Sequence, residues 1–252
     1  MRTWMCLLLT LTGCALSNPE RDKARWEREL DREISGEKTI WIDVDHPVIY
    51  GYAGGGPGEF SYRNRARGGT DEGNANLYRF GFIGPASLLV DWMSSTDPLG
   101  ETETKADWLD IYFFGNRPLW PNRRLRFNAR PGIYFDKLNL KKAQSGDAEP
   151  WTLGFRFELE AEVDVIKAKQ FNLSLFGNGR VGGGWGRTKV SGNEVSSNSW
   201  GYGYEAGLRA QFRRFVGSIS WLDRRTQLGG DPLIEDTEYR FQGATLMFGL
   251  RW

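Results

Sequence analysis

After its first residues, the 252-residue chain has no uninterrupted run of the roughly 18 apolar residues that a membrane-spanning helix needs. This excludes a helical membrane protein and leaves a soluble protein or a barrel. Cysteine is scarce, and Cys6 and Cys14 both precede the body of the chain. With His46 as the single histidine, we expect neither a metal site nor a cofactor. The formal net charge of +1 gives no reason to expect nucleic acid as a partner.

Glycine and aromatic residues, in contrast, are abundant. The chain has 32 glycines and 11 tryptophans, and aromatic residues make up 14% of it. Transmembrane barrels need aromatic side chains at both membrane interfaces and glycine where strands bend sharply. The composition therefore favours a barrel over a soluble protein.

Residues 1–17 have the pattern of an export signal. Arg2 supplies a small basic region, residues 4–11 are apolar, and small residues follow. Two processing routes remain open. Residues 11–14 (LTGC) form a lipobox-like sequence that would make Cys14 the lipidated first residue, whereas residues 15–17 (ALS) have the small-x-small pattern of ordinary cleavage.

Two segments separate this signal from the regular part of the chain. Residues 18–38 predict a short, charged, amphipathic helix in the periplasm, in which Trp26, Leu30 and Ile34 recur four apart. Residues 39–76 are a Gly-rich linker that we interpret as a loop, a partial plug or an extra hairpin. The Gly-rich run lacks the Gly-Lys-Ser/Thr ending of a phosphate-binding loop.

From Leu77 onward, eight segments alternate apolar and polar residues with the period of two that a half-buried strand requires. The clearest is residues 151–165, where Trp151, Leu153 and Phe155 begin an apolar face opposite Thr152 and Gly154. This pattern predicts an all-β fold: a transmembrane, antiparallel, up-and-down β-barrel over residues 77–252. We expect eight strands, with ten as the alternative.

The connections between these segments alternate in length. Four polar connections of about ten residues each are expected at 94–104, 138–149, 188–198 and 227–236. Short connections alternate with them, as long outer loops alternate with short periplasmic turns in outer-membrane barrels. An even number of strands then puts both barrel ends, and so the N-terminus, on the periplasmic side.

If the apolar faces contact lipid, the opposite faces fill the lumen with charges. An eight-stranded barrel is just wide enough for side chains to fill it. Arg79, Arg213, Asp91 and Asp110 also have inward parity. Folding the chain about a point near Ala143 sets Arg126 beside Glu160 and Glu162. We expect a lumen ion-pair network of Arg124, Arg126, Arg130, Arg156, Glu158, Glu160, Glu162, Asp164, Arg180, Glu205 and Arg209.

Residues 77–252 resemble the small eight-stranded outer-membrane barrels, such as the transmembrane domain of outer membrane protein A and outer membrane proteins X and W. The chain ends on alternating apolar residues and a terminal aromatic, similar to the C-terminal assembly signal of that class: Leu246, Phe248, Leu250 and Trp252. The resemblance implies a bacterial outer-membrane location, a monomer surrounded by outer-membrane lipid, and the barrel-assembly machinery as a partner during biogenesis.

Three functions follow from a charged, filled lumen without metal ligands. The leading expectation is a non-enzymatic barrel that serves as an envelope structural protein or anchor, or that displays surface loops. The first alternative is a small pore for small solutes. The second is a lipid-modifying enzyme, for which His46 beside Asp43 and Asp45 is the only imidazole.

Overall fold

The computed structural model describes residues 49–64, 68–84, 86–100, 104–121, 125–141, 146–168 and 171–251. The predicted signal peptide (1–17) with Cys14, the predicted helix (18–38) and His46 lie outside the described residues, as do Arg124 and Trp252. Within the described ranges, no helix is long and apolar enough to cross a membrane.

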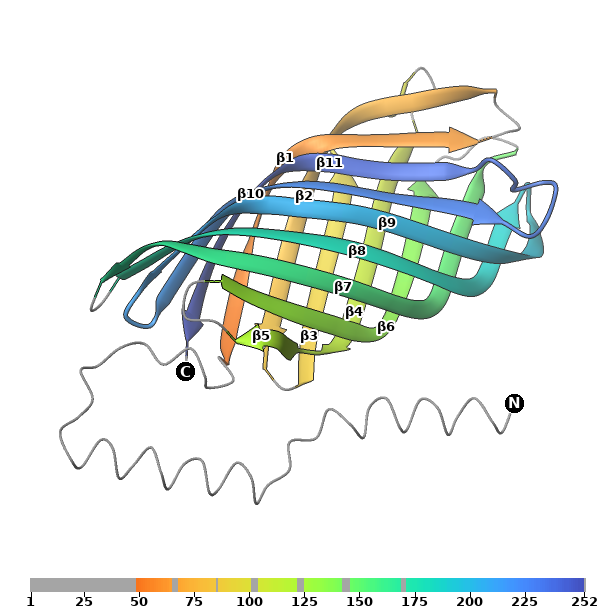
Figure 1. The fold of residues 1–252 in the computed structure, drawn as a ribbon. Coiled ribbons are helices and arrows are strands. Elements are labelled where there is room, and N and C mark those ends of the chain that lie inside the picture. Colours follow the sequence, from red (N-terminus) through yellow and green to blue (C-terminus); the bar gives the residue numbers. More distant parts are fainter. Residues whose placement is uncertain are drawn as a thin grey trace, which may run out of the picture.

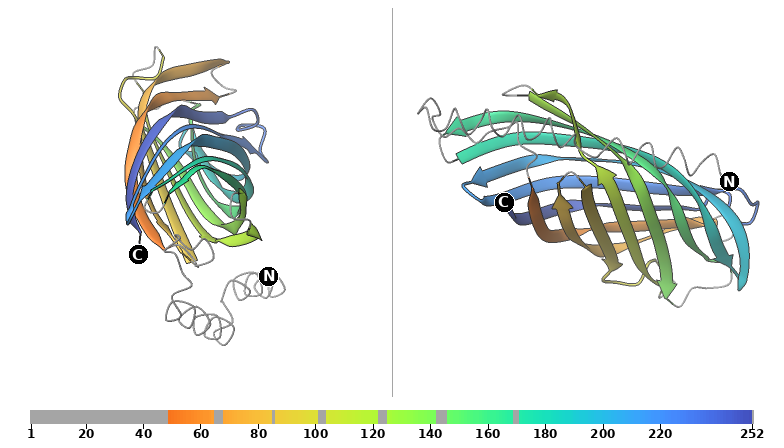
Figure 2. Two further views of the ribbon diagram at one scale, coloured as in Figure 1. Left: turned by 60° about the vertical axis from the view of Figure 1, so that its left-hand side comes forward. Right: turned by 90° about the horizontal axis from the view of Figure 1, so that it is seen from below.

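The described residues form one antiparallel sheet that closes on itself (Figures 1 and 2). Apart from β4 and β5, strands that are consecutive in the sequence are paired in the sheet. β1 pairs with β11 to complete the wall. The strands are β1 (Tyr50–Asn64), β2 (Gly69–Ile83), β3 (Ala86–Ser95), β4 (Lys105–Gly115), β5 (Arg117–Pro121), β6 (Leu125–Lys141), β7 (Ala148–Ala168), β8 (Phe171–Val190), β9 (Asn193–Phe212), β10 (Phe215–Gly229) and β11 (Glu238–Arg251).

The wall has ten positions, because β4 and β5 share one of them. β4 pairs with residues 132–141 of β6, and β5 pairs with residues 126–129 of the same strand. Only Asn116 separates β4 from β5, and the register shifts between Pro118 and Trp120. The expectation of eight strands is therefore wrong, and the alternative of ten holds.

One additional strand is β1, which lies within the segment interpreted as a Gly-rich linker. The other arises because the first of the eight expected segments, from Leu77 to Trp92, forms two strands, the second part of β2 and most of β3. Glycine lets β1 approach its neighbours closely: a Cβ on Gly55 would lie 1.9 Å from the carbonyl oxygen of Leu77, and one on Gly56 would lie 2.1 Å from that of Ala244. The glycines of β1 therefore allow close pairing with both neighbouring strands. The same glycines leave too little alternation of apolar and polar residues to predict a strand from the sequence.

The barrel has two distinct ends. At the terminal end lie Tyr50, Gly84, the turn at 213–214 and Arg251. At the loop end lie Gly68 and residues 96–100, 146–147, 191–192 and 230–237. The expected loop at 188–198 is wrong, because β8 and β9 continue through it to a tight turn at Ser191 (φ 49°) and Gly192 (φ 86°).

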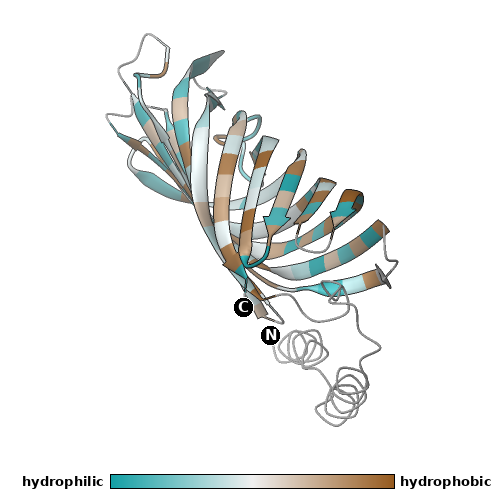
Figure 3. Ribbon diagram, turned by 90° about the vertical axis from the view of Figure 1, so that its left-hand side faces the viewer, coloured by the Kyte–Doolittle hydropathy of each residue, from teal (hydrophilic) through white to brown (hydrophobic). Residues whose placement is uncertain are grey.

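The outer surface of the half nearer the terminal end, the terminal half, is apolar. Every strand except β1 exposes large apolar side chains there, in alternation with inward residues. Figure 3 shows this alternation as hydrophobic and hydrophilic bands along the ribbon. This apolar belt includes Tyr78, Phe80, Phe82, Trp92, Phe113, Ile133, Trp151, Leu153, Phe155, Phe157, Leu159, Val163, Leu175, Val181, Trp185, Trp200, Tyr202, Tyr204, Leu208, Phe212, Phe215, Ile219, Trp221, Leu246, Phe248 and Leu250.

In the half nearer the loop end, the loop half, this arrangement is inverted. The outward residues are polar, including Glu59, Arg63, Glu72, Asp107, Lys137, Lys141, Arg187, Glu194, Ser196, Asp223, Arg225 and Arg240. The interior is an apolar core of Phe60, Tyr62, Ala75, Leu77, Met93, Leu99, Ala106, Trp108, Leu138, Leu140, Ala148, Val190, Leu222, Leu228, Ile234, Tyr239 and Phe241.

The inversion falls between consecutive residues of one strand. On β10, Trp221 is outward and exposed, whereas Leu222 is inward and fully buried. On β3, Trp92 is likewise outward and exposed, whereas Met93 is inward and buried. Because successive side chains of a strand point to opposite faces, a change in the parity of the apolar residues turns the apolar face from outside to inside.

Candidate functional site in the charged lumen

The interior of the terminal half carries charged side chains from most of the wall. Arg79, Asp91, Asp110, Glu158 and Glu160 are each at most 3% exposed. The strands direct these residues inward by the same alternation that places the apolar belt outside. Since burying an unpaired charge is costly, their mutual contacts decide whether the lumen is stable.

A first network of alternating charges crosses the lumen from β9 to β7. Arg79 donates to Glu205 at 2.7 Å and to Asp91 at 2.6 and 3.0 Å. Arg224 then pairs with both Asp91 and Asp110. Arg156 completes the first network with two hydrogen bonds to Asp110, at 2.8 and 2.9 Å. Three guanidinium groups thus balance three carboxylates, and bidentate contacts fix the orientation of Arg79 and Arg156.

A second network lies among β6, β7 and β9. Arg130 donates to Glu158 at 2.6 Å and to Glu160 at 2.7 Å. Arg209 bridges Glu160 at 3.1 Å and Glu162 at 2.7 Å.

The second network continues along β6 and β7 toward the terminal end. The Arg126 guanidinium lies 2.9 Å from a Glu162 oxygen and 2.7 Å from an Asp164 oxygen. Lys167 also approaches Asp164, at 3.6 Å. Four cations therefore meet four carboxylates in the second network.

The structure thus places nearly all of the predicted lumen residues inside the barrel. Arg180 lines the lumen but has no ion pair in either network. There are three further differences. Arg213 lies in the β9–β10 turn, exposed and with φ 53°, so its assignment to the lumen is wrong. Arg224 belongs to the first network but was not predicted, although it has the same parity as the inward residues Ser218 and Ser220. Arg124 lies outside the described residues.

The expected contact between Arg126 and Glu160 is also wrong. The register of β6 and β7 places Arg126 opposite Glu162 and Asn128 opposite Glu160. Glu160 therefore takes its partners from Arg130 and Arg209. The contact between Arg126 and Glu162, which the sequence also predicts, is present in the structure.

The apolar core closes the lumen toward the loop end. Trp108 is fully buried and packs edge-on against Tyr239, with ring centroids 4.9 Å apart. Leu99 and Ile234, from the β3–β4 and β10–β11 connections, are also fully buried in this core. Residues of these two connections thus fold inward and fill the lumen between the first network and the loop end.

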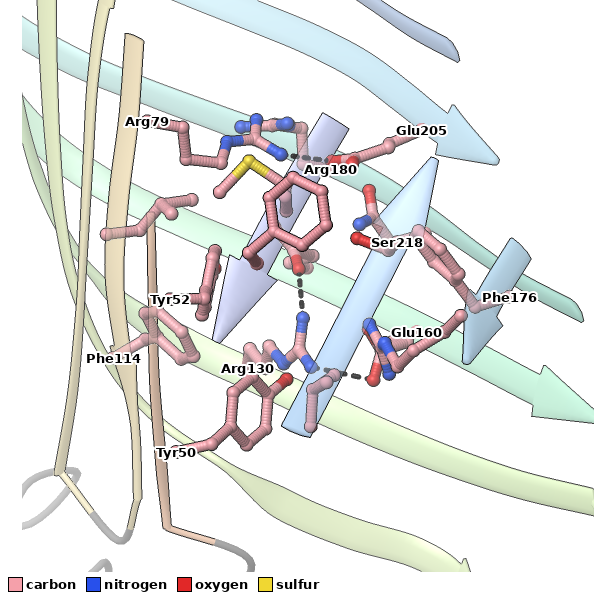
Figure 4. A pocket seen from close by; sticks show the side chains of 17 residues that line it. Tyr50, Tyr52, Arg79, Phe114, Arg130, Glu160, Phe176, Arg180, Glu205 and Ser218 are labelled. Carbon is pink, nitrogen blue, oxygen red and sulfur yellow. Dashed lines mark hydrogen bonds and ion pairs between the residues drawn. The ribbon is translucent and has the colours of Figure 1, made fainter. Parts of the chain in front are cut away.

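A cavity lies in the lumen between the two networks (Figure 4). It has about 50 Å³ of space for water-sized molecules, which corresponds to room for roughly three or four waters. Its charged lining consists of Arg79, Arg130, Arg180 and Arg209 with Glu158, Glu160 and Glu205. Groups of His, Cys, Asp and Glu that could hold a metal ion do not occur in the described ranges.

Comparisons with known proteins find similar folds only. No family model matches the chain, and no curated protein matches it. Two solved structures are similar at 10% sequence identity. The outer membrane protease OmpT from Escherichia coli has a TM-score of 0.40, with 81% of this chain and 97% of that one covered. The CymD monoaromatic hydrocarbon channel has a TM-score of 0.29, with coverage of 82% and 89%.

The first of these comparisons corrects one expectation. We expected a protein that is not an enzyme, but a barrel to which this chain is similar is a protease. The prediction of a non-enzymatic protein is therefore withdrawn. At 10% identity the likeness assigns no activity to this chain.

Proposed function

We propose that the protein is an integral barrel of the bacterial outer membrane that holds a folded, polar platform outside the lipid. The terminal half spans the bilayer, and the loop half stands in water. The single observation that carries this proposal is the inversion of the wall, which is apolar outside in one half and apolar inside in the other.

The boundary between the halves has the composition of a membrane interface. The last apolar outward residue of six strands is a tyrosine or a tryptophan: Tyr78, Trp92, Trp151, Trp185, Trp200 and Trp221. Such rings occupy the interface because they combine an apolar body with a polar N–H or O–H group. Directly beyond them come Asn76, Ser94, Glu149, Arg187, Asn198 and Asp223.

The lumen supports a platform or anchor better than the alternative of a pore for small solutes. Paired charges fill the terminal half, and the apolar core fills the loop half. A conducting path would have to cross both. The platform is instead supported by the 20 residues each of β8 and β9, which carry the wall well past the aromatic boundary.

The proposed orientation puts the terminal end in the periplasm. Its connections are short, and outer-membrane barrels have their short turns there. Leu246, Phe248 and Leu250 face outward on β11 beside that end, as an assembly signal read by the barrel-assembly machinery would require. The barrel closes within one chain, which fits a monomer surrounded by lipid.

Cysteine labelling in intact cells tests location and orientation together. Glu194→Cys lies at the loop end and Arg214→Cys at the terminal end, and the wild type controls for Cys6 and Cys14. A membrane-impermeant maleimide should label Glu194→Cys in intact cells, and Arg214→Cys only after the outer membrane is permeabilised. The opposite pattern would reverse the orientation, and recovery of the protein without membranes would reject the proposal.

A further inference from the structure

Among the lumen arginines of the described residues, Arg180 is the one that belongs to neither network. Arg180 is 6% exposed and lines the cavity from β8. Its Nε and Nη1 atoms are buried and find no hydrogen-bond partner among the described residues. The other guanidinium groups of the cavity each have at least one carboxylate within 3.1 Å.

Arg180 lies among charges of both signs. The guanidinium groups of Arg79, Arg156 and Arg224 lie close enough to repel it electrostatically. The carboxylates that attract it are those of Glu158, Glu205 and Asp91. Glu158 already accepts from Arg130 at 2.6 Å. Every carboxylate of the two networks is already held by another cation. The charge of Arg180 is therefore left over without a hydrogen-bonded carboxylate, and burying it without a counter-ion is unfavourable.

The cavity offers space and further polar groups for a counter-ion. The Asn178 side chain also faces the cavity, and its Oδ1 atom is buried without a hydrogen bond to any described residue. Ser218 lines the same space from β10, and Arg79 and Arg130 lie at its rim in their ion pairs (Figure 4). A planar guanidinium presents paired N–H donors that match the oxygens of a carboxylate or phosphate.

We propose that the cavity is an anion-binding site, in which Arg180 holds a small oxyanion of the carboxylate or phosphate type. The anion replaces the few waters that the cavity can contain and neutralises the leftover charge. Arg180 forms the bidentate contact, and Asn178 and Ser218 contribute hydrogen bonds from the side.

Thermal unfolding of the full barrel in non-ionic detergent tests the site, with inorganic phosphate and acetate as probes at constant ionic strength. A ligand that binds the folded state alone raises the melting temperature with a saturable dependence on its concentration. We expect such a rise for the wild type, and the stronger of the two probes distinguishes phosphate from carboxylate. Arg187→Gln is the matched control, since Arg187 lies on the same strand but outside the barrel.

Arg180→Met should bind the probe roughly 10-fold to 100-fold more weakly, as expected for losing a hydrogen-bonded charge. It should also melt above the wild type without the probe and below it at saturation, because the substitution removes both an unpaired buried charge and a ligand. Arg180→Lys keeps the charge without the planar fork and should bind with intermediate affinity. If Arg180→Met does not fold, the comparison is made with this variant.

Glu158→Gln provides the opposite test, because removing a carboxylate that attracts Arg180 and repels an anion should strengthen binding. The proposal is overturned if phosphate and acetate shift the wild type, Arg180→Met and Arg187→Gln equally, or if neither probe shifts the wild type. It is also overturned if Glu158→Gln weakens binding.

Discussion

The two halves of this barrel share the same ten-position wall but bury opposite kinds of side chain. In the terminal half, carboxylates and guanidinium groups face inward and apolar side chains face outward. In the loop half, Trp108 and its neighbours face inward and charged side chains face outward. An antiparallel wall accepts either arrangement, because its backbone hydrogen bonds are satisfied within the sheet. The medium that each half contacts therefore decides which face is apolar.

The two interiors are also stabilised by different forces. The loop half buries apolar surface away from water, which is the usual driving force of a soluble core. The terminal half gains little from that effect if lipid surrounds it, so its order depends on paired charges of fixed geometry. Substitutions of the same kind should therefore have different consequences in the two halves.

The largest effect should follow from Trp108→Ala. Trp108 is fully buried among Phe60 and Tyr239, and emptying such a site costs about 3–5 kcal/mol. Urea unfolding of the barrel in detergent measures the loss. Trp221→Ala removes the same side chain from the outer boundary, where it is half exposed, and should cost clearly less. Equal losses would mean that the loop half has no core of its own.

The second network should behave as one coupled unit. Removing a single partner of a buried ion pair costs about 3–5 kcal/mol, so Arg130→Ala and Glu160→Ala should each destabilise the barrel strongly. Their effects should be less than additive, because the two side chains meet at 2.7 Å. The pair Arg126→Ala and Asp164→Ala should behave in the same way. Full additivity for both pairs in urea unfolding would refute the described contacts.

An outward arginine should distinguish the two halves directly. Leu159→Arg places a cation in the middle of the apolar belt, where it costs roughly 2–4 kcal/mol in a bilayer. Folding into lipid vesicles, followed by gel mobility without heating, reports the loss. Ser196→Arg is also outward, but it lies in the loop half and should fold normally. Equal impairment of both variants would contradict the assignment of the belt to lipid.

The smallest effect should come from the ion pair on the outer face of the loop half. Arg187 and Glu194 meet at 3.0 Å, but their side chains are 63% and 62% exposed. Such a pair contributes at most about 1 kcal/mol and is screened by salt. Arg187→Ala should therefore change the urea midpoint little, and not at all at high salt. A loss as large as that of Arg130→Ala would show that the outer face is not in water.

Much of the terminal half could be predicted from the sequence. Strict alternation of apolar and polar residues there indicates both a strand and which of its side chains lie on each face of the wall. The pattern of residues 151–165 predicts a strand and predicts that the charged residues from Arg156 to Asp164 point inward, and the structure has both. The loop half was harder to predict. Between Thr188 and Asn198 the outward residues are polar and the inward ones are small, so the alternation disappears and the segment resembles a loop. The signal that could have revealed the core is the change in apolar parity, as from Trp221 to Leu222.

The charged site was predictable as a set but not in its pairings. Inward parity identifies Arg130, Glu160 and Arg209, whereas the register that joins them depends on where each hairpin turns. The contacts across the lumen, such as Arg79 with Glu205, join strands far apart in sequence. No local sequence pattern predicts these contacts. The unpaired charge of Arg180 can be recognised only when the ion pairs of the other lumen residues are known.

The inversion of the wall, on which this account depends, can be measured with spin labels at two outward positions of β9. Ala206→Cys lies within the apolar belt and Ser196→Cys lies beyond the aromatic boundary. In lipid vesicles, collisions of the label with oxygen report lipid, and collisions with a water-soluble nickel chelate report water. We predict that oxygen dominates for Ala206→Cys and that the nickel chelate dominates for Ser196→Cys. Equal accessibility to the chelate at both positions would contradict the account, because the whole outer wall would then contact water.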